Sequence, residues 1–334
     1  MLKNISIIGD GGMGTVLAML LCEKEIPVRI WGYDSDQLNQ MAQSLENKKF
    51  LPGYKLSERL IFEADDEKIM SDAELIISAV PCQFIRSIWS RLKKYIPANV
   101  PIVSVAKGIE NKTLLRPSQI IAEILELNDD RLLAALSGPT IADELARKLP
   151  ASACAAGSNE GLIKSIQETF STNWFRIYTN TDIVGVELAG AMKNIIAIAA
   201  GIIDGIGAGD NCKAALVTRG LAEITRLGIS CGAIQDTFTG LTGLGDLVTT
   251  CISPSGRNRS FGEKIGKGQT IELAKKSTDS VVEGITTCES VISLAKEKNV
   301  EMPITQAIYE VLFLNKSVQQ AINELMSREL KAEH

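Results

Sequence analysis

The sequence predicts an α/β protein with a parallel sheet in its N-terminal half and an all-α C-terminal half. Two observations predict this fold class. Apolar strands alternate with helical patterns up to about residue 181, which is typical of a parallel sheet covered on both faces. From residue 182 onward, helical periodicity continues with almost no strand signal. We therefore expect one domain at 1–181 and a second at 182–334.

The expected elements follow from the spacing of apolar residues. Strands are expected where short runs are almost wholly apolar, at 5–8, 28–31, 75–80, 102–106, 132–136, 152–156 and 175–178. Helical patterns separate them, for example at 14–24, 83–94 and 159–170. In the second half, helices are expected at 184–203, 214–227, 281–298, 304–315 and 319–330. Glycine-rich stretches are expected to interrupt these helices, at 201–209, 240–245 and 256–268.

The first strand runs directly into a glycine-rich turn, GDGGMG at 9–14, and a helix follows at once. This G-x-G-x-x-G pattern between strand and helix is typical of a Rossmann-type dinucleotide-binding turn. Gly9 permits the turn, Gly11 lets backbone approach a pyrophosphate, and Gly14 lets the helix pack on the strand. The helix N-terminus adds N–H groups and a positive dipole for the phosphates. An ordinary turn is the alternative, and the strand–turn–helix context favours the dinucleotide.

Charge and apolar patterning argue against two classes of partner. The net charge is −5 and no basic block is present, so the electrostatic signature of a nucleic-acid-binding protein is missing. The N-terminus lacks the pattern of a signal peptide, and the longest apolar run, 195–206, contains Gly and Asp. We expect neither nucleic-acid binding nor stable membrane insertion.

Cysteine and histidine usage restricts the chemistry. The seven cysteines are scattered and show no C-x-x-C spacing, which indicates free thiols in a reducing cytoplasm and no metal site. The single histidine, His334, is the last residue. If the protein is an enzyme that needs a general base, Lys, Asp, Glu, Tyr or Cys must take that role.

Lys193 is the first candidate for such a group. It interrupts a helix that is apolar on most faces, and Asn194 adjoins it. The small residues Gly190, Ala191 and Ala197 would let another element approach closely. Most helix lysines are solvated, and that alternative stays open here. A partly buried lysine would have a depressed pKa and would serve as an acid or base near neutral pH.

Three further positions combine polar groups with glycine. Asp246 follows the glycine-rich run 240–245 and precedes Thr249 and Thr250, where it could cap the next helix or take part in chemistry. In the expected loop 253–260, two arginines and an amide could bind a phosphate or remain a solvated turn. Lys107 ends a buried strand at the edge where α/β sheets bind ligands, with a solvated lysine as the alternative.

The residues alone leave the choice between NAD and NADP open. An acidic side chain about twenty residues beyond the glycine turn normally binds the ribose 2′-hydroxyl and favours NAD. Asp34 stands at that distance, but Tyr33 or Ser35 could occupy the position instead, and Arg29 is near.

These clusters form an ordered set that resembles the bacterial-type NAD(P)-dependent glycerol-3-phosphate dehydrogenases nearly end to end. The segments that carry the resemblance are 8–18, 104–110, 137–142, 187–201, 240–251, 256–261, 281–284 and 301–305. The resemblance implies reduction of dihydroxyacetone phosphate to sn-glycerol 3-phosphate with NAD(P)H, for phospholipid synthesis. It also implies a cytoplasmic homodimer that acts on a small phosphorylated substrate.

The resemblance also implies a role for each matched residue. Lys193 would be the general acid/base, Asp246 and Thr250 would position it, and Asn194 would contact the substrate. The substrate phosphate pocket would be formed by Arg257, Asn258, Gly256, Lys107, Gly138 and Thr140. The dinucleotide side would comprise Gly9, Gly11, Gly12, Met13, Gly14, Tyr33, Ala142, Val281 and Glu283, with Lys107 and Arg257 touching both ligands.

The chain departs from the family pattern at four places. At one of them Thr140 and Ile141 replace a serine and a phenylalanine, which keeps a hydroxyl. Gly12 and Met13 stand where a polar residue and an aromatic are usual, and Gly256 replaces a serine. Tyr33 stands where basic residues are common, which argues against a strong preference for NADP. Two other functions are weighed against this one: a related dehydrogenase of 3-hydroxy acids or sugar acids, and a sensor that binds NAD(H) without turnover.

Overall fold

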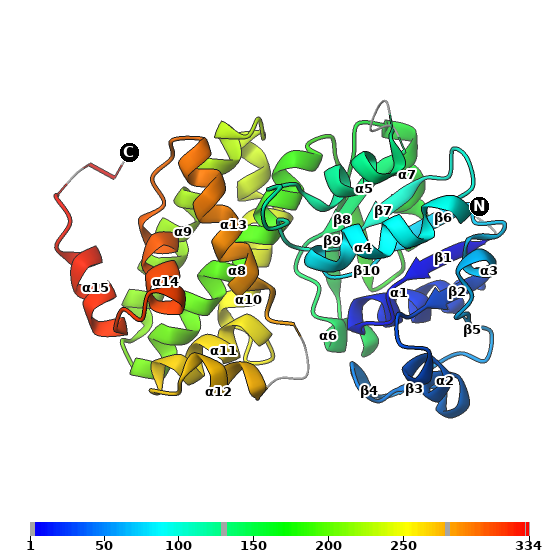
Figure 1. The fold of residues 1–334 in the computed structure, drawn as a ribbon, viewed down its shortest axis with the longest axis horizontal. Coiled ribbons are helices and arrows are strands. Elements are labelled where there is room, and N and C mark those ends of the chain that lie inside the picture. Colours follow the sequence, from blue (N-terminus) through cyan, green and yellow to red (C-terminus); the bar gives the residue numbers. More distant parts are fainter. Residues whose placement is uncertain (1–3, 128–131, 278–280, 331, 334) are drawn as a thin grey trace.

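The computed structural model describes residues 4–127, 132–277, 281–330 and 332–333. A sheet-containing half and a helical half lie side by side along the long axis (Figure 1). In the described part of the first half, eight strands form one sheet in the order β10-β9-β8-β7-β6-β1-β2-β5. The strands are β1 (Ile5–Ile8), β2 (Val28–Trp31), β5 (Ile61–Phe62), β6 (Leu75–Ser78), β7 (Ile102–Ser104), β8 (Leu133–Ser137), β9 (Ala151–Ala156) and β10 (Phe175–Asn180).

The sheet is mostly parallel, which confirms the predicted class, but one pairing differs. β1 lies inside the sheet and pairs in parallel with β2 and β6, placing Ile7 beside Ile30 and Ile77. β8 and β9 pair antiparallel. The connection at 138–150 carries only the short helix α6 (Ala142–Ala146), so the chain re-enters the sheet from the end at which it left. A parallel return needs a crossover that spans the sheet, usually along a longer helix.

Helices cover both faces of this sheet. Ile7 belongs to the core under α1 (Gly12–Glu23) and α7 (Glu160–Phe170), whereas its neighbour Ile8 belongs to the core on the other face. The second face is covered by α3 (Asp66–Met70), α4 (Cys82–Leu92) and α5 (Pro117–Leu125), with the turn η1 (Lys93–Tyr95). The region 35–62 had no assigned elements in the prediction. It forms α2 (Ser35–Ser44), β5 and a small hairpin of β3 (Glu46–Asn47) and β4 (Leu51–Lys55).

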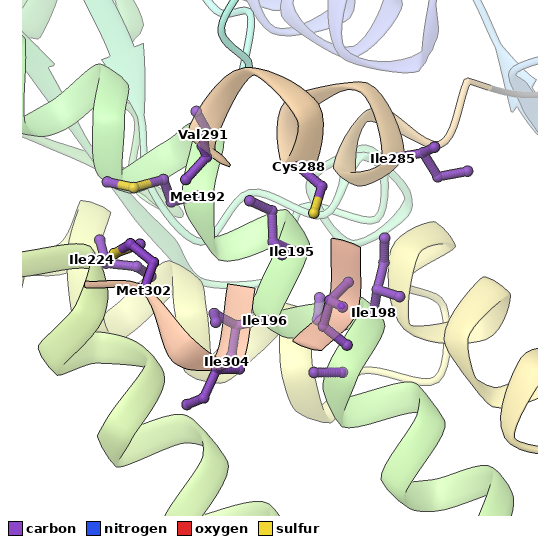
Figure 2. Packing of buried hydrophobic residues seen from close by; sticks show 14 of the residues in the cluster. Met192, Ile195, Ile196, Ile198, Ile224, Ile285, Cys288, Val291, Met302 and Ile304 are labelled. Carbon is purple, nitrogen blue, oxygen red and sulfur yellow. The ribbon is translucent and has the colours of Figure 1, made fainter. Parts of the chain in front are cut away.

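The described part of the second half contains helices and no strand, as expected. They are α8 (Ile183–Ile206), α9 (Asp210–Ser230), α10 (Asp246–Ile252), α11 (Arg257–Gly266), α12 (Ile271–Lys276), α13 (Glu283–Glu297), α14 (Pro303–Phe313) and α15 (Val318–Met326), with turns η2 (Gln235–Thr239) and η3 (Leu241–Gly245). The apolar side chains of α8 pack at the centre. Figure 2 shows Met192, Ile195 and Ile196 among side chains from α9, α13 and α14.

The predicted glycine-rich break at 256–268 is wrong for most of its length, because these residues form α11. The reason is close packing between helices. A Cβ added to Gly201 of α8 would lie 1.9 Å from the Arg259 carbonyl oxygen, and one added to Gly262 would lie 2.0 Å from that of Ile198. Glycines on both helices therefore let α8 and α11 touch backbone to backbone. The glycines that suggested a break in the sequence are packing positions.

α8 is longer than the apolar run expected from the sequence. Its 24 residues include an 18-residue window with a mean hydropathy of 1.6, so by length and composition it could cross a membrane. The whole of that window is buried inside the protein. Burial on all sides is typical of the central helix of a protein core.

Candidate active site

The turn after β1 forms an open cradle at the N-terminus of α1. Gly9 has φ of +117°, and Gly14 packs against it so closely that an added Cβ would lie 2.0 Å from the Gly9 carbonyl oxygen. Gly11 is the N-cap of α1, and no side chain caps it. A Cβ added to Gly11 would meet nothing within 4 Å. The free N–H groups and the open space fit a diphosphate, at the carboxyl end of an inner strand.

The other residues of the predicted dinucleotide side surround this cradle. Ala142 begins α6 beside Gly12, where an added Cβ would lie 3.5 Å from the Ala142 Cβ. Met13 packs partly against the core of the sheet. Tyr33 follows β2 and is 74% exposed. Asp34, the acidic candidate at this position, caps α2 by accepting hydrogen bonds from the backbone of Asp36 and Gln37.

Arg29, which the sequence placed near the same position, is engaged elsewhere. Its guanidinium donates hydrogen bonds to the carbonyl oxygens of Lys68 and Ser71, at the end of α3. Arg29 is therefore tied to the backbone of α3 by these bonds.

Lys193 lies in the middle of α8 and is buried, so the prediction of a solvated lysine is excluded. Its Nζ donates a hydrogen bond of 2.7 Å to Asp246 Oδ1 and another to Thr250 Oγ1. Asp246 and Thr250 lie one turn apart at the start of α10. Asn194 is also buried, but among the described residues its side chain makes no recorded hydrogen bond to this group.

A second lysine shares the same carboxylate. Lys107, in the loop after β7, donates to Asp246 Oδ2 at 2.6 Å and to the Gly138 carbonyl oxygen at 2.9 Å. Thr140 Oγ1 donates to the same carbonyl at 3.1 Å. Gly190 of α8 lies beside this pair: a Cβ added there would lie 3.0 Å from Ser137 Oγ and 3.6 Å from the Lys107 Cγ. The sheet half and the helical half meet at this pair of lysines.

Asp246 does not cap α10. The preceding turn η3 is π-helical and runs straight into α10, so Asp246 is already inside a helix and its side chain is free to bind both lysines. π-Helical turns occur frequently at functional sites because they re-aim side chains.

Burial of the ammonium group lowers the pKa of Lys193 to about 8. The positive charge of Lys107 also lowers it, while Asp246 opposes both effects. A lysine with such a pKa can exchange a proton near neutral pH.

A second open helix N-terminus lies at α11. Gly256 is its N-cap, again without a side-chain cap. Arg257 is exposed, and none of the recorded hydrogen bonds and ion pairs of the described chain involves its guanidinium. Asn258 is buried, and its Oδ1 accepts a hydrogen bond of 2.9 Å from the Gly284 N–H. The helix dipole and the guanidinium together suit an anion such as a phosphate.

α13 begins beside this helix. Glu283 is its first residue; burial raises the pKa of this carboxyl, while the charges of Arg257, Lys107 and Lys193 act in the opposite direction. Glu283 is therefore close to all three cations. Val281 is 41% exposed and precedes the helix.

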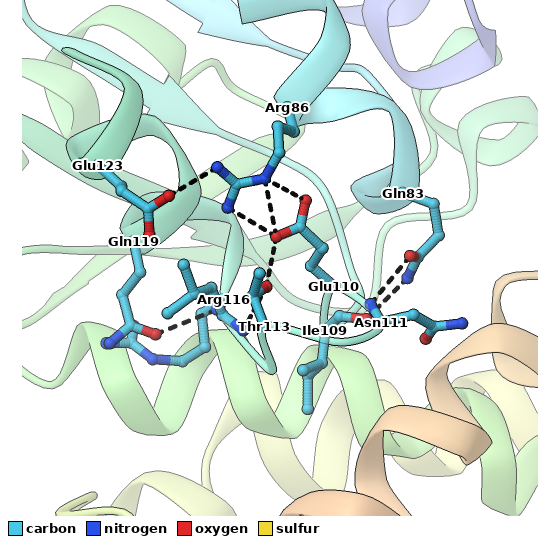
Figure 3. Close-up of polar contacts among 10 residues, drawn as sticks. Gln83, Arg86, Ile109, Glu110, Asn111, Thr113, Arg116, Gln119 and Glu123 are labelled. Atoms are coloured by element: carbon cyan, nitrogen blue, oxygen red, sulfur yellow. Dashed lines mark hydrogen bonds and ion pairs between the residues drawn. The ribbon is translucent and has the colours of Figure 1, made fainter.

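The loop 105–116, which carries Lys107, is held by hydrogen bonds from α4 and α13. The sequence did not predict these contacts. Arg86 of α4 donates to both carboxylate oxygens of Glu110 at 2.8–3.2 Å (Figure 3). Gln83 of α4 and Ser290 of α13 donate to the Ile109 carbonyl oxygen at 2.7 and 3.0 Å. The signal available in the sequence was a glutamate three residues after Lys107, with no visible partner.

Asn47 was also missed. It is fully buried, and its Nδ2 donates to the Asp10 carbonyl oxygen and to Thr15 Oγ1, both at 2.7 Å. The hydrogen bonds of Asn47 therefore attach the glycine turn to β3, a contact that the sequence did not indicate.

The described residues contain no group of three or more His, Cys, Asp or Glu side chains that could hold a metal ion. All seven cysteines are free. His334 lies outside the described residues.

A Rossmann-type half joined to a helical half that supplies a buried lysine defines an NAD(P)-dependent dehydrogenase. The pattern described as "NAD-dependent glycerol-3-phosphate dehydrogenase N-terminus" matches residues 4–163, and that of the C-terminus matches residues 182–323. The chain belongs to the NAD(P)-dependent glycerol-3-phosphate dehydrogenase family.

Relatives and solved structures agree with this membership. The chain is 47% identical to glycerol-3-phosphate dehydrogenase [NAD(P)+] of Citrifermentans bemidjiense, over 100% of this chain and 99% of the relative. It is 42% identical to the enzyme of that name from Staphylococcus aureus, over 99% of this chain and 100% of the relative. The crystal structure of glycerol-3-phosphate dehydrogenase from Coxiella burnetii matches with a TM-score of 0.94 and 37% identity, covering 98% of this chain and 99% of that one.

Proposed function

We propose that this protein interconverts dihydroxyacetone phosphate and sn-glycerol 3-phosphate with NAD(P)H or NAD(P)+, and so supplies glycerol 3-phosphate for phospholipid synthesis. The observation that carries the proposal is the buried Lys193–Asp246–Lys107 group, in which Lys107 of the sheet half meets Lys193 and Asp246 of the helical half. Family membership along nearly the whole chain supports the same reaction.

In this proposal each half of the chain has its own task. Residues 1–181 form the dinucleotide domain and residues 182–334 the substrate domain. Arg257, Asn258 and the backbone of Gly256 hold the substrate phosphate, with Lys107, Gly138 and Thr140 completing the pocket. Gly9, Gly11, Gly12, Met13, Gly14, Tyr33, Ala142, Val281 and Glu283 lie on the dinucleotide side.

Lys193 acts as the general acid in reduction and the general base in oxidation. Bound nicotinamide supplies the hydride that reduces the ketone carbon. Lys193 gives its proton to the carbonyl oxygen, and Asp246 and Thr250 hold the ammonium group in place. Asn194 contacts the substrate next to it. The phosphate is remote from the reacting carbon, so its binding energy can orient the substrate.

The test is NADH and NADPH oxidation, followed by absorbance, with dihydroxyacetone phosphate as substrate. Lys193→Ala should lower kcat by about 1000-fold, within the range that general acid–base catalysis contributes. The dinucleotide affinity and the thermal unfolding midpoint should stay near the wild-type values. Lys267→Ala removes an exposed lysine at the C-cap of α11 and serves as the control. Near-normal turnover of Lys193→Ala would contradict the assignment.

Two alternatives give different results in the same assay. A dehydrogenase of 3-hydroxy acids or sugar acids would accept unphosphorylated substrates, whereas the proposed site requires the phosphate. A sensor would bind NADH without oxidising it.

The proposal includes a homodimer in the cytoplasm. The family membership supports the dimer, and seven free cysteines are typical of a reducing compartment. Sedimentation equilibrium at micromolar concentration should give twice the mass of 36.1 kDa, and a monomer mass would contradict the dimer.

A further inference from the structure

Asp10 is the one charged residue of the glycine turn 9–14, and its side chain packs against Gly32 at the end of β2. A Cβ added to Gly32, which follows β2, would lie 2.7 Å from the Asp10 carboxyl carbon and 2.8 Å from its Oδ2. In Rossmann-type folds the adenosine ribose lies between the glycine turn and the end of β2, because the acidic residue that binds the 2′-hydroxyl follows that strand. The Asp10 carboxylate lies between the same two segments.

The position of Asp10 is fixed from below. Asn47 Nδ2 donates to the Asp10 carbonyl oxygen at 2.7 Å, and Asn47 Oδ1 accepts from the Phe50 N–H at 3.1 Å and from Gln37 Nε2 at 3.2 Å. Asn47 is itself fully buried. These bonds hold the backbone of the turn in place at Asp10, the residue that carries the carboxylate.

The carboxylate of Asp10 has no hydrogen-bond donor for its buried oxygen. Within the described residues, Oδ2 is enclosed and unpartnered. Buried carboxylate oxygens in a purely structural role are normally hydrogen-bonded or paired. Burial raises the pKa of Asp10, and a hydrogen bond from its own backbone lowers it. The charge of Lys49 also lowers it and that of Asp34 raises it, so these two charges lie close by. Lys49 is exposed, and its Nζ lies 5.1 Å from the centre of the Phe50 ring.

We propose that Asp10 is a specificity-determining residue that makes this enzyme favour NAD(H) over NADP(H). Together with Asp34, it places negative charge where the 2′-phosphate of NADP(H) has to lie. The 2′-hydroxyl of NAD(H) carries no charge and can donate a hydrogen bond to a carboxylate. This inference rests on the proposed function, because it assumes that a dinucleotide binds at the glycine turn.

The experiment measures dissociation constants of NADH and NADPH by fluorescence titration without substrate. Wild-type protein should bind NADH at least about tenfold more tightly than NADPH at low salt; tenfold corresponds to ~1.4 kcal/mol. Asp10→Asn should reduce this ratio about tenfold, mainly by tightening NADPH. Raising the salt concentration should shrink the effect, because screening weakens interactions between exposed charges.

The control makes the same charge change far from the cradle. Asp72 has φ of +56°, which Asn tolerates, and it precedes β6 at the opposite end of the sheet. Asp72→Asn should leave the ratio unchanged. Lys49→Met is a second variant, independent of the turn, and should weaken NADPH more than NADH.

Two results distinguish failure of the inference about Asp10 from failure of the proposed function. Equal wild-type affinities, or a ratio that Asp10→Asn and Lys49→Met leave unchanged, would overturn the inference about Asp10 alone. Binding of neither dinucleotide would overturn the proposed function and this inference with it.

Discussion

At the scale of single residues, the site is built from charges that share partners. Lys193 and Lys107 bind the two oxygens of one carboxylate, Asp246, and neither lysine is far from the other's charge. Burial is the main cause that lowers the pKa of Lys193 to about 8; the charge of Lys107 lowers it too, and Asp246 opposes both effects. Arg257, by contrast, is exposed and free to meet a ligand.

The first prediction concerns pH. Burial lowers the pKa of Lys193 to about 8, so the protonated acid is lost above that pH. The kcat/KM for ketone reduction should fall about tenfold per pH unit above pH ~8, and that for alcohol oxidation should rise up to the same pH. Lys107→Met removes a positive charge that lowers the pKa of Lys193. In this variant the fall in kcat/KM should begin at a higher pH. Profiles of kcat/KM against pH for both proteins check this prediction. A fall that begins at the same pH in both would contradict it.

The second prediction concerns Arg257. Arg257→Ala removes the guanidinium beside the N-terminus of α11, and hydrogen bonds to charged groups contribute about 1.5–3 kcal/mol. The KM for dihydroxyacetone phosphate should rise roughly 10–100-fold, with a smaller change in kcat. Steady-state kinetics measures both. Lys267→Ala, at the C-cap of the same helix, should change neither value; an equal effect of the two variants would point to general loss of charge.

At the scale of elements, glycines decide how closely α8 and α11 approach. A side chain at Gly201 or Gly262 would collide with backbone of the other helix. This contact places the N-terminus of α11, with Arg257, in the same half as Lys193 of α8. The relative position of the proposed acid, Lys193, and the proposed phosphate site therefore depends on Gly201 and Gly262.

The third prediction tests this contact. Gly262→Ala places a Cβ 2.0 Å from the Ile198 carbonyl oxygen, so the helices have to separate. Overpacking of this kind destabilises by about 3 kcal/mol, and the KM for the phosphorylated substrate should rise as well. Denaturant unfolding and kinetics measure the two effects.

Gly161→Ala is the matched control. Its Cβ would meet only the end of the Asn159 side chain, at 3.2 Å, and alanine favours the helix. Its stability should be unchanged or slightly higher. If Gly262→Ala behaved in the same way, the close contact of α8 and α11 would be unimportant.

At the scale of the whole molecule, buried polar contacts join the two halves. Glu187 of α8 accepts hydrogen bonds from the Ser118 N–H at 2.8 Å and the Ser118 Oγ at 2.6 Å, and it pairs with Arg116. These residues form the N-terminus of α5, on the sheet half. With the braced loop 105–116, Glu187 keeps Lys107 within reach of Asp246.

The fourth prediction concerns the contact of Glu187 with Ser118 and Arg116. Glu187→Ala leaves the N-terminus of α5 and Arg116 without their buried partner, which destabilises by about 3 kcal/mol. The calorimetric unfolding temperature should fall, and Glu187→Gln should recover part of the loss by accepting from Ser118. Glu324→Ala removes an exposed partner of Lys316 and should cost less than about 1 kcal/mol. Equal losses in the two alanine variants would contradict the role of Glu187.

Most of the fold was readable from the chain because its signals are local. The strand–glycine–helix run at 5–18 and the continuous apolar strands depend only on neighbouring residues. The same held for Lys193, since a lysine inside an apolar helix stands out in sequence. The antiparallel β9 and the helix α11 were not predicted, because the direction of β9 and the packing of Gly262 depend on distant segments.

By itself, then, the sequence determined the α/β class, the glycine turn and the candidate residues for chemistry. Tertiary structure alone decided that Lys107 and Lys193 share Asp246 and that Asp10 faces the end of β2. The physical reason is range. Helix and strand patterns arise from contacts a few residues apart, whereas a shared carboxylate requires groups 139 residues apart to meet, as Lys107 and Asp246 do.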